Sequence, residues 1–397
     1  MEAGVLVQQV AYLKGSIFMT TNPQSTPVRA FAGLQQAQAF QPLPKPTGPA
    51  PYHLALDTVL PADTIAAITG SGHIALHIIG DTGGVKLPQP QQIVANHMET
   101  DLATAAADAK PAFFYHLGDI VYYYGESSQY YSQFYEPYAA YPAPIIGIPG
   151  NHDGDLVPHA QPAVPSLAAY TENFCSPSPH LTSEAGDAAR LSMTQPNPYF
   201  TLETPFATFV GLYTNVPEGG RLDAAQIAWF HGELLSAPAD RALIVTMHHP
   251  IYSQDKHHGG SSYMEGVLND AVAATGRIPD IVFAAHVHNY QRYTRRFGGR
   301  EIPYIVAGSG GYWNLYAVTD DNGNPVPTPA PVANQPDLTL ETAKDNRHGF
   351  MRLDISATTL TGRYFTVPRP QESWSAPAEQ FDAFVLDLKA HTVATSS

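Results

Sequence analysis

Five short apolar runs in the middle of the chain constrain its fold more than any other feature. Each has the length of a β-strand, and those near the centre of the sequence are almost wholly apolar, which is typical of strands buried on both faces of a sheet. Amphipathic helical patterns separate the runs, so we predict an α/β layered core. The runs are Ala75–Ile79, Phe113–Leu117, Ile145–Ile148, Leu243–Met247 and Ile281–Ala285.

The segments between and after these runs complete the predicted order of elements. Asp223 and Gln226 have the spacing of a capping box at the start of a helix. The helical stripes are Val94, Met98, Leu102 and Ala105, then Ile227, Phe230 and Leu234, then Met264, Val267, Leu268 and Val272. Later strands are predicted at Ile302–Ala307, Gly349–Ile355, Leu360–Phe365 and Ala383–Leu388, with a surface excursion over Asp320–Pro336.

Each of the five apolar runs is followed by a residue that can bind a metal ion. In open α/β sheets the carboxyl ends of the strands border the ligand crevice, so these residues should meet in one pocket. Taken singly, each has an ordinary structural explanation as a turn or capping residue. Together and in this order they predict a metal site. The five segments are Gly80–Gly83, Gly118–Tyr122, Pro149–Asp153, His248–Pro250 and His286–His288.

Composition limits the kind of metal and the kind of partner. Cys175 is the only cysteine, so a thiolate cluster cannot form, and any metal must have nitrogen and oxygen ligands, as Zn, Mn, Fe, Mg or Ca do. The 35 acidic residues outnumber the 20 basic ones, and the net charge of -15 argues against binding to nucleic acid or to an anionic membrane surface.

The five motifs resemble, in order, those of the calcineurin-like metallophosphoesterases, and among them those of the purple acid phosphatases. They read GDTG, GDIVY, GNHD, VTMHHP and AHVHNYQR, and the resemblance spans residues 75 to 310. It implies a two-sheet β-sandwich core flanked by helices in α/β/β/α layers. Three positions depart from the pattern: Ala285 replaces a usual Gly, Gln291 replaces a usual Glu, and Gly83 stands where most of the superfamily has a His ligand.

The resemblance also implies a ligand set for two metal ions. Asp119 would bridge them, and Tyr122, at a compensating spacing for Gly83, would serve in place of the missing His. The first metal would then be bound by Asp81, Tyr122 and His288, and the second by Asn151, His248 and His286. Three anionic groups suit Fe(III) in the first position, and the more neutral second set suits a divalent ion such as Fe, Zn or Mn.

The activity implied is hydrolysis of small-molecule phosphomonoesters through a metal-bound hydroxide. His152 would stabilise the phosphoryl oxygens or protonate the leaving group, oriented by Asp153, and His249, His257 and His258 are candidate substrate contacts. Arg292 is more readily explained as an ion-pairing strand residue. Two alternatives stay open: a phosphodiesterase or nucleotide hydrolase on the same scaffold, and a non-catalytic, metal-stabilised binding module.

Two domains are predicted. Residues 1–70 form a Pro-rich N-terminal extension that can add a few strands, with Gln41–Pro51 as an extended strap, and residues 71–390 form the catalytic domain. Glu2 precedes the first apolar stretch, which is unlike a secretory signal. The cytoplasm is therefore the expected compartment, or an exported location if a leader has been removed.

Overall fold

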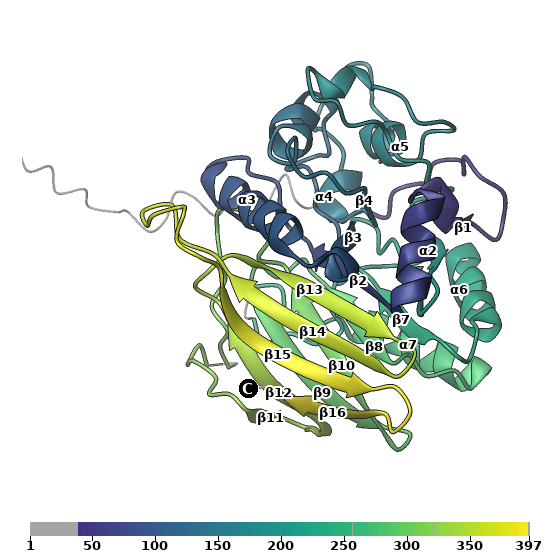
Figure 1. Cartoon of the computed structure of the whole chain (residues 1–397), viewed down its shortest axis with the longest axis vertical. Helices are drawn as coiled ribbons and strands as arrows, with labels where there is room; N and C mark the ends of the chain where they lie inside the picture. Colours follow the sequence, from purple (N-terminus) through teal and green to yellow (C-terminus); the bar gives the residue numbers. More distant parts are fainter. Residues whose placement is uncertain (1–38, 256, 321, 396–397) are drawn as a thin grey trace, which may run out of the picture. The chain divides into compact units, whose positions relative to one another are not determined.

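Two β-sheets packed face to face form the centre of the computed structural model (Figure 1), which describes residues 39–255, 257–320 and 322–395. Within these residues the first sheet has nine strands and the second has seven. In spatial order the first contains β1 (His53–Leu54), β5 (Phe200–Glu203), β6 (Ala207–Gly211), β7 (Ala242–Thr246), β8 (Ile281–Ala284), β10 (Arg300–Ala307), β9 (Tyr290–Phe297), β12 (Gln335–Lys344) and β11 (Ala330–Val332). The second contains β16 (Thr392–Thr395), β15 (Glu379–Asp387), β14 (Thr359–Thr366), β13 (Gly349–Ser356), β2 (His73–Ile79), β3 (Pro111–His116) and β4 (Ile145–Gly147).

Helices flank both sheets, while the outer face of β14, β15 and β16 in the second sheet carries no helix in the view of Figure 1. Asp223 caps one of the helices, because its Oδ1 accepts a 2.7 Å hydrogen bond from the Gln226 backbone, although the Gln226 side chain binds Tyr213 instead of closing a capping box. Helices α2 (Ala62–Ser71) and α3 (Gln89–Thr104) lie on the second sheet, and α6 (Ala224–Ser236) and α7 (Ser262–Thr275) lie on the first. The shorter helical turns are α4 (Asn151–Gly154), α5 (Ala168–Phe174), η1 (Leu56–Thr58), η2 (Ala107–Ala109), η3 (Ser127–Gln129), η4 (Tyr131–Tyr135) and η5 (Ser183–Ala185).

The parallel strands at the centre of each sheet determine where the functional loops lie. Strands β2, β3 and β4 are parallel to one another, and so are β6, β7 and β8. Large apolar side chains fill the space between the sheets, for example Tyr115 stacked on Phe209 with ring centroids 5.4 Å apart. Since parallel strands end at the same edge, the loops after β2, β3, β4, β7 and β8 leave the two sheets on one side.

The predicted fold class is confirmed, with two sheets flanked by helices. All five apolar runs are strands, β2, β3, β4, β7 and β8, and the later predicted strands correspond to β10, β13, β14 and β15. The stretch Asp320–Pro336, predicted as a surface excursion, has no buried residue among those that the structure describes, although β11 lies inside it and β12 begins in it. Strand β9 was not predicted as an element, although Arg292 was expected to lie on a strand, because its sequence YQRYTRRF carries three arginines and lacks an apolar run.

The N-terminal extension is only partly described, since residues 1–38 lie outside the described part of the chain. Residues 39–70 contain β1, which pairs with β5, and most of α2. Leu54, Leu60 and Ile68 pack into the main core. A division of the chain at residue 70 stays a proposal.

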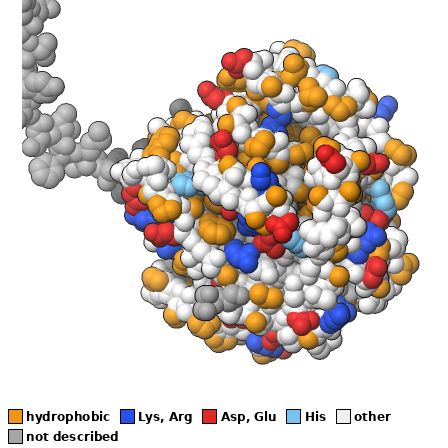
Figure 2. Space-filling view, in the orientation of Figure 1, with side chains coloured by type: hydrophobic (Ala, Val, Ile, Leu, Met, Phe, Trp, Pro, Cys, Tyr) orange, Lys and Arg blue, Asp and Glu red, His pale blue; other side chains and the backbone are white. Residues whose placement is uncertain are grey.

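The surface and the helices bear on the predicted partners. On the face shown in Figure 2, acidic and basic side chains are interspersed over the described residues. Among the helices of residues 39–395 that the structure describes, none combines the length and the apolar character needed to cross a bilayer.

Candidate metal centre

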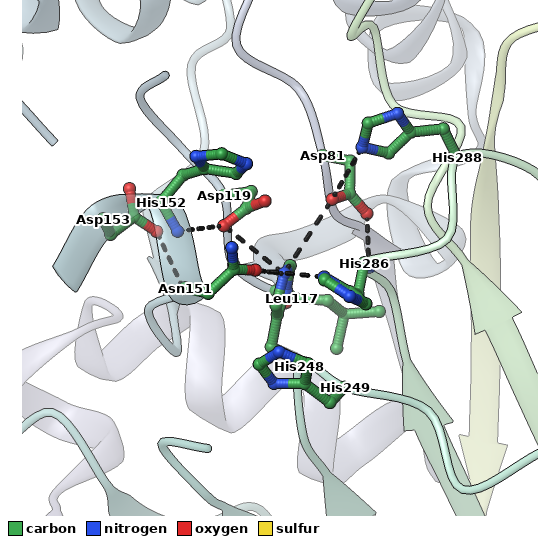
Figure 3. A network of polar contacts seen from close by, with 12 residues as sticks. Asp81, Leu117, Asp119, Asn151, His152, Asp153, His248, His249, His286 and His288 are labelled. Atoms are coloured by element: carbon green, nitrogen blue, oxygen red, sulfur yellow. Dashed lines mark hydrogen bonds and ion pairs between the residues drawn. The ribbon is translucent and has the colours of Figure 1, made fainter. Parts of the chain in front are cut away.

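The five motif loops converge at one rim of the sheets, where Figure 3 shows their side chains pointing toward one another. Three of these residues have left-handed backbone conformations: Asp81 with φ 55°, Asp119 with φ 54° and His286 with φ 66°. Such conformations are costly for residues other than Gly and cluster at functional sites, where the surrounding structure holds them. Ala285 is not among them, so its methyl group causes no backbone strain.

One group of side chains surrounds Asn151, at the start of α4. Its Oδ1 lies 3.1 Å from His248 Nε2 and 3.0 Å from His286 Nδ1. His248 Nε2 is also 3.3 Å from Asp119 Oδ1, and Asp119, His248 and His286 are all buried with ligand atoms close enough to share one ion. These are the residues predicted to hold the second metal, together with the bridging carboxylate.

The outer hydrogen bonds of the histidines show that this group fits a cation. His248 Nδ1 lies 2.8 Å from the Leu117 carbonyl and His286 Nε2 lies 3.1 Å from Glu218 Oε1, so each ring donates outward and turns its other nitrogen inward. The inward nitrogen of neutral His286 faces the Asn151 oxygen, and two acceptors repel unless a positive charge lies between them. Asp119 Oδ2 is buried with no hydrogen-bond partner among the described residues, which leaves it free for a metal.

A second group surrounds Asp81, the second residue after β2. Its Oδ1 accepts a 3.1 Å hydrogen bond from the Tyr122 hydroxyl and lies 3.6 Å from His288 Nε2. His288 Nδ1 is 3.0 Å from the Asn314 carbonyl, so this ring too donates outward and turns Nε2 inward. The structure thus brings together Asp81, Tyr122 and His288, the residues predicted to hold the first metal.

The close packing around Tyr122 explains why Gly83 stands where the wider superfamily has His. A Cβ atom on Gly83 would lie 2.7 Å from the Tyr122 ring and 2.4 Å from Gln133 Oε1, which accepts a hydrogen bond from the Tyr122 backbone. A larger residue at position 83 would therefore displace the tyrosine. Gly80 makes room in the same way for Ala285, since a Cβ on Gly80 would lie 2.5 Å from the Ala285 methyl.

The electrostatics of both groups favour bound positive charge. Although burial opposes a charged ring, the Asp119 and Asp81 carboxylates raise the pKa of His248 to about 9. Burial, together with the charges of Asp119 and Asp81, holds the pKa of Tyr122 well above its usual value, so without a metal the phenol is protonated and donates to Asp81. Burial lowers the pKa of His286 to about 4, with His258 contributing, which keeps that ring neutral and able to bind a metal.

His152 and Asp153 follow Asn151 on α4, but their relation differs from the expected one. Asp153 does not orient the His152 ring, because its carboxylate accepts backbone hydrogen bonds from Gly150 at 2.8 Å, Val121 at 3.0 Å and Ile120 at 3.1 Å. The Tyr123 carbonyl, 2.8 Å from His152 Nδ1, holds that ring instead. Asp153 thus ties the Asp119 loop to the Asn151 loop and acts on the site through the backbone.

The three histidines predicted to contact substrate lie at different depths. His249 is fully buried, with Nδ1 2.7 Å from Thr214 Oγ1 and its ring 4.3 Å from that of His286, so it lies behind the metal position. His258 packs against His286, with their ring centroids 4.3 Å apart. His257 is exposed and stacks on Tyr316 at 4.5 Å.

The structure adds residues that the motifs did not indicate. Glu218 contacts both His286 and His258. Tyr312 packs its ring 4.2 Å from Tyr122 and 4.4 Å from His288. Tyr312 follows the predicted strand Ile302–Ala307 and the Gly-Ser-Gly-Gly segment after it, a position from which its place near the site could have been inferred. Nothing in the sequence around Glu218 indicates that it reaches this site.

Comparison with known proteins assigns the family. The model of the calcineurin-like phosphoesterase family matches residues 75–290, and the chain belongs to this family of phosphoric ester hydrolases. Within the family it is purple acid phosphatase-like: it is 30% identical over 160 residues to purple acid phosphatase 1 of Ipomoea batatas and 29% identical over 205 residues to purple acid phosphatase 15 of Arabidopsis thaliana. Those matches cover 38% and 48% of this chain and 29% and 34% of the relatives, so the chain spans about a third of their length.

Solved structures agree on the fold. The purple acid phosphatase PPD1 from yellow lupin (Lupinus luteus) seeds matches with a TM-score of 0.52 and 16% identity, over 79% of this chain and 54% of that one. The structure titled "Structure of PhoD" matches with a TM-score of 0.52 and 13% identity, over 82% of this chain and 72% of that one. At these identities the likeness shows the two-sheet architecture alone.

Proposed function

We propose that this chain is a dinuclear-metal phosphatase that hydrolyses small-molecule phosphomonoesters. The observation that carries the proposal is the orientation of the ligand set. The rings of His248, His286 and His288 each donate a hydrogen bond outward from one N–H and turn the other nitrogen toward the Asp and Asn oxygens of the site. The similarity of this chain to proteins named purple acid phosphatases supports the same assignment, and one of those relatives is named an Fe(3+)-Zn(2+) purple acid phosphatase.

The donor chemistry suits two different ions. Asp81, Asp119 and Tyr122 would hold the first, with His288. A phenol whose pKa is raised by burial would release its proton to water only when its oxygen binds a strong Lewis acid such as Fe(III). Asn151, His248 and His286 would hold a divalent ion, Fe, Zn or Mn, with Asp119 shared between the two. When bound, such ions acidify water and polarise phosphoryl oxygens.

The other residues position the substrate and move protons. Because His152 Nδ1 donates to the Tyr123 carbonyl, Nε2 is the atom of this ring that can donate to a phosphoryl oxygen or to the departing alkoxide. His258 borders a cavity of about 550 Å³ that it lines together with Glu218 and Arg221, and the alcohol part of the ester would lie there. Asp153 holds the two metal-binding loops in register through backbone hydrogen bonds.

Activity assays and metal analysis on one sample test the proposal. We expect release of phosphate from an aryl monoester, faster than cleavage of the matching aryl diester, with two metal ions bound to each chain. Faster cleavage of the diester would favour a phosphodiesterase or nucleotide hydrolase on the same scaffold. No turnover of either ester by fully metal-loaded protein would indicate a binding module instead.

A further inference from the structure

A carboxylate outside the five motifs joins the metal side of the site to its substrate side. Glu218 follows β6, and its Oε1 lies 3.1 Å from His286 Nε2 and 3.2 Å from His258 Nδ1. Both rings therefore donate to one carboxylate oxygen. One ring belongs to a proposed metal ligand, and the other borders the cavity proposed for the substrate.

The loop that carries Glu218 is held in place by hydrogen bonds to distant segments. Asn215 exchanges two hydrogen bonds with the backbone of Gln41, at 2.8 and 2.9 Å, so the Pro-rich strap clamps one end of the loop. Ser261 Oγ donates to the Gly219 carbonyl at 2.5 Å, which joins the other end to the start of α7. A glutamate that served only solubility would not need such anchoring, since its side chain would point into water.

We propose that Glu218 is a positioning residue that fixes both histidines. By accepting from His286 Nε2 it selects the tautomer whose Nδ1 points at the second metal position, and by accepting from His258 it aims that ring at the cavity. When a carboxylate accepts the outer N–H of a metal-binding histidine, removing it commonly lowers metal affinity about 10- to 100-fold. The proposal rests on the proposed function, since it assigns Glu218 to the same metal centre.

A comparison of substitutions tests the proposal, with the divalent metal alone as the probe. Glu218→Ala removes the acceptor, Glu218→Gln keeps a neutral acceptor oxygen, and His258→Ala removes only the substrate-side ring. Glu172→Ala is the matched control, because Glu172 Oε1 also lies 3.1 Å from a histidine, His180, and its side chain is 51% exposed against 45% for Glu218. Zinc affinity is measured by titration of metal-depleted protein, and visible absorption reports the ferric position.

We expect weaker binding of the divalent metal and unchanged binding of iron. Glu218→Ala should weaken zinc binding about 10- to 100-fold and leave any tyrosinate–iron absorption unchanged, because it does not touch Tyr122. Glu218→Gln should recover part of the affinity. His258→Ala should raise KM and leave zinc affinity as in the wild type, and Glu172→Ala should change neither.

Different results would refute different claims. If the wild type binds two metals and the zinc affinity of Glu218→Ala stays within about twofold of it, the positioning role is overturned, because the loss typical of such carboxylates would be absent. A wild-type protein that binds no metal would refute the proposed function itself. Equal loss of both metals in Glu218→Ala would also contradict the proposal, since it would point to general disruption of the site.

Discussion

At the scale of single residues, the site depends on a few side chains held in unfavourable backbone conformations. Asp81 and Asp119 both have positive φ, and Asp tolerates this conformation better than most residues. The conformation aims both carboxylates into the space between the histidines, and it explains why the Asp119 Oδ2 atom is buried without a partner among the described residues. Substitutions of these residues should thus affect metal binding more than folding.

Asp119→Asn tests the shared carboxylate. A neutral amide cannot offset the charge of two cations, so we expect a loss of kcat of about 100-fold or more, of the size that removing an electrostatic group from an active site produces. Occupancy of both metals should fall, as measured by elemental analysis. Asp108→Asn, at an exposed position, is the control. Normal turnover with both metals retained would show that Asp119 is not shared.

Tyr122→Phe tests the first metal. If Tyr122 binds Fe(III) as a phenolate, charge transfer should colour the iron-loaded wild type, and the variant should lose the visible band. The ring would remain to pack against Tyr312, 4.2 Å away, so the free energy of unfolding should change little. Tyr124→Phe, two residues along and half-buried, should keep the colour. An active, fully iron-loaded and colourless wild type would rule out this ligand.

At the scale of elements, the loops after parallel strands bring the predicted metal ligands together, and the loops also restrain one another. Asp153 connects the loop after β4 to the loop after β3, while Gln41 on the strap clamps the loop after β6. These hydrogen bonds join segments that are far apart in sequence, 174 residues in the case of Gln41 and Asn215. A small displacement of one loop should therefore shift a predicted metal ligand on another loop.

Gly83→Ala tests this coupling between loops. The new methyl group would lie 2.7 Å from the Tyr122 ring and 2.4 Å from Gln133 Oε1, so either both side chains or the Gly83 backbone must move. We expect weaker iron binding and a shifted visible band, with stability lower by about 1–3 kcal/mol from overpacking. Gly70→Ala, in α2, is the control, because nothing lies within 4 Å of its Cβ position. Unchanged iron affinity in Gly83→Ala would mean that the loop adjusts without moving Tyr122.

At the scale of the whole molecule, a buried ion pair connects the two sheets. Arg292 on β9 of the first sheet donates two hydrogen bonds to Asp382 on β15 of the second, at 2.7 and 3.0 Å, and both side chains are almost completely buried. The Tyr290 hydroxyl donates to the same carboxylate at 2.7 Å. The prediction from sequence that Arg292 is an ion-pairing strand residue is confirmed.

Asp382→Ala should destabilise the protein strongly without touching the metal centre. It leaves the Arg292 guanidinium buried without its carboxylate, which typically costs about 3–5 kcal/mol. Urea unfolding monitored by circular dichroism measures the loss, and metal content at low urea should be normal. Glu372→Gln, which breaks an exposed ion pair with Arg347, should change stability little. Equal stability of both variants would contradict the role given to the inter-sheet pair.

The sequence by itself determined the order of the strands that carry the candidate site, and it predicted which residues would bind metal. Both are local properties, since an apolar run predicts a buried strand and the residue that follows it lies at the strand's end. Parallel pairing of β2, β3 and β4 then brought Asp81, Asp119 and Asn151 to one rim, as expected.

Only the tertiary structure decided which side chains support the ligands. Glu218 reaches His286 across 68 residues, and Asp153 bonds to backbone amides 32 and 33 residues away instead of to its neighbour His152. Strands β9 and β12 were likewise not predicted as elements, because polar strands gain their stability from pairing with neighbours and show no apolar run of their own. Hydrogen bonds of this kind depend on how the backbone folds in space, and they leave no periodic signal in the sequence.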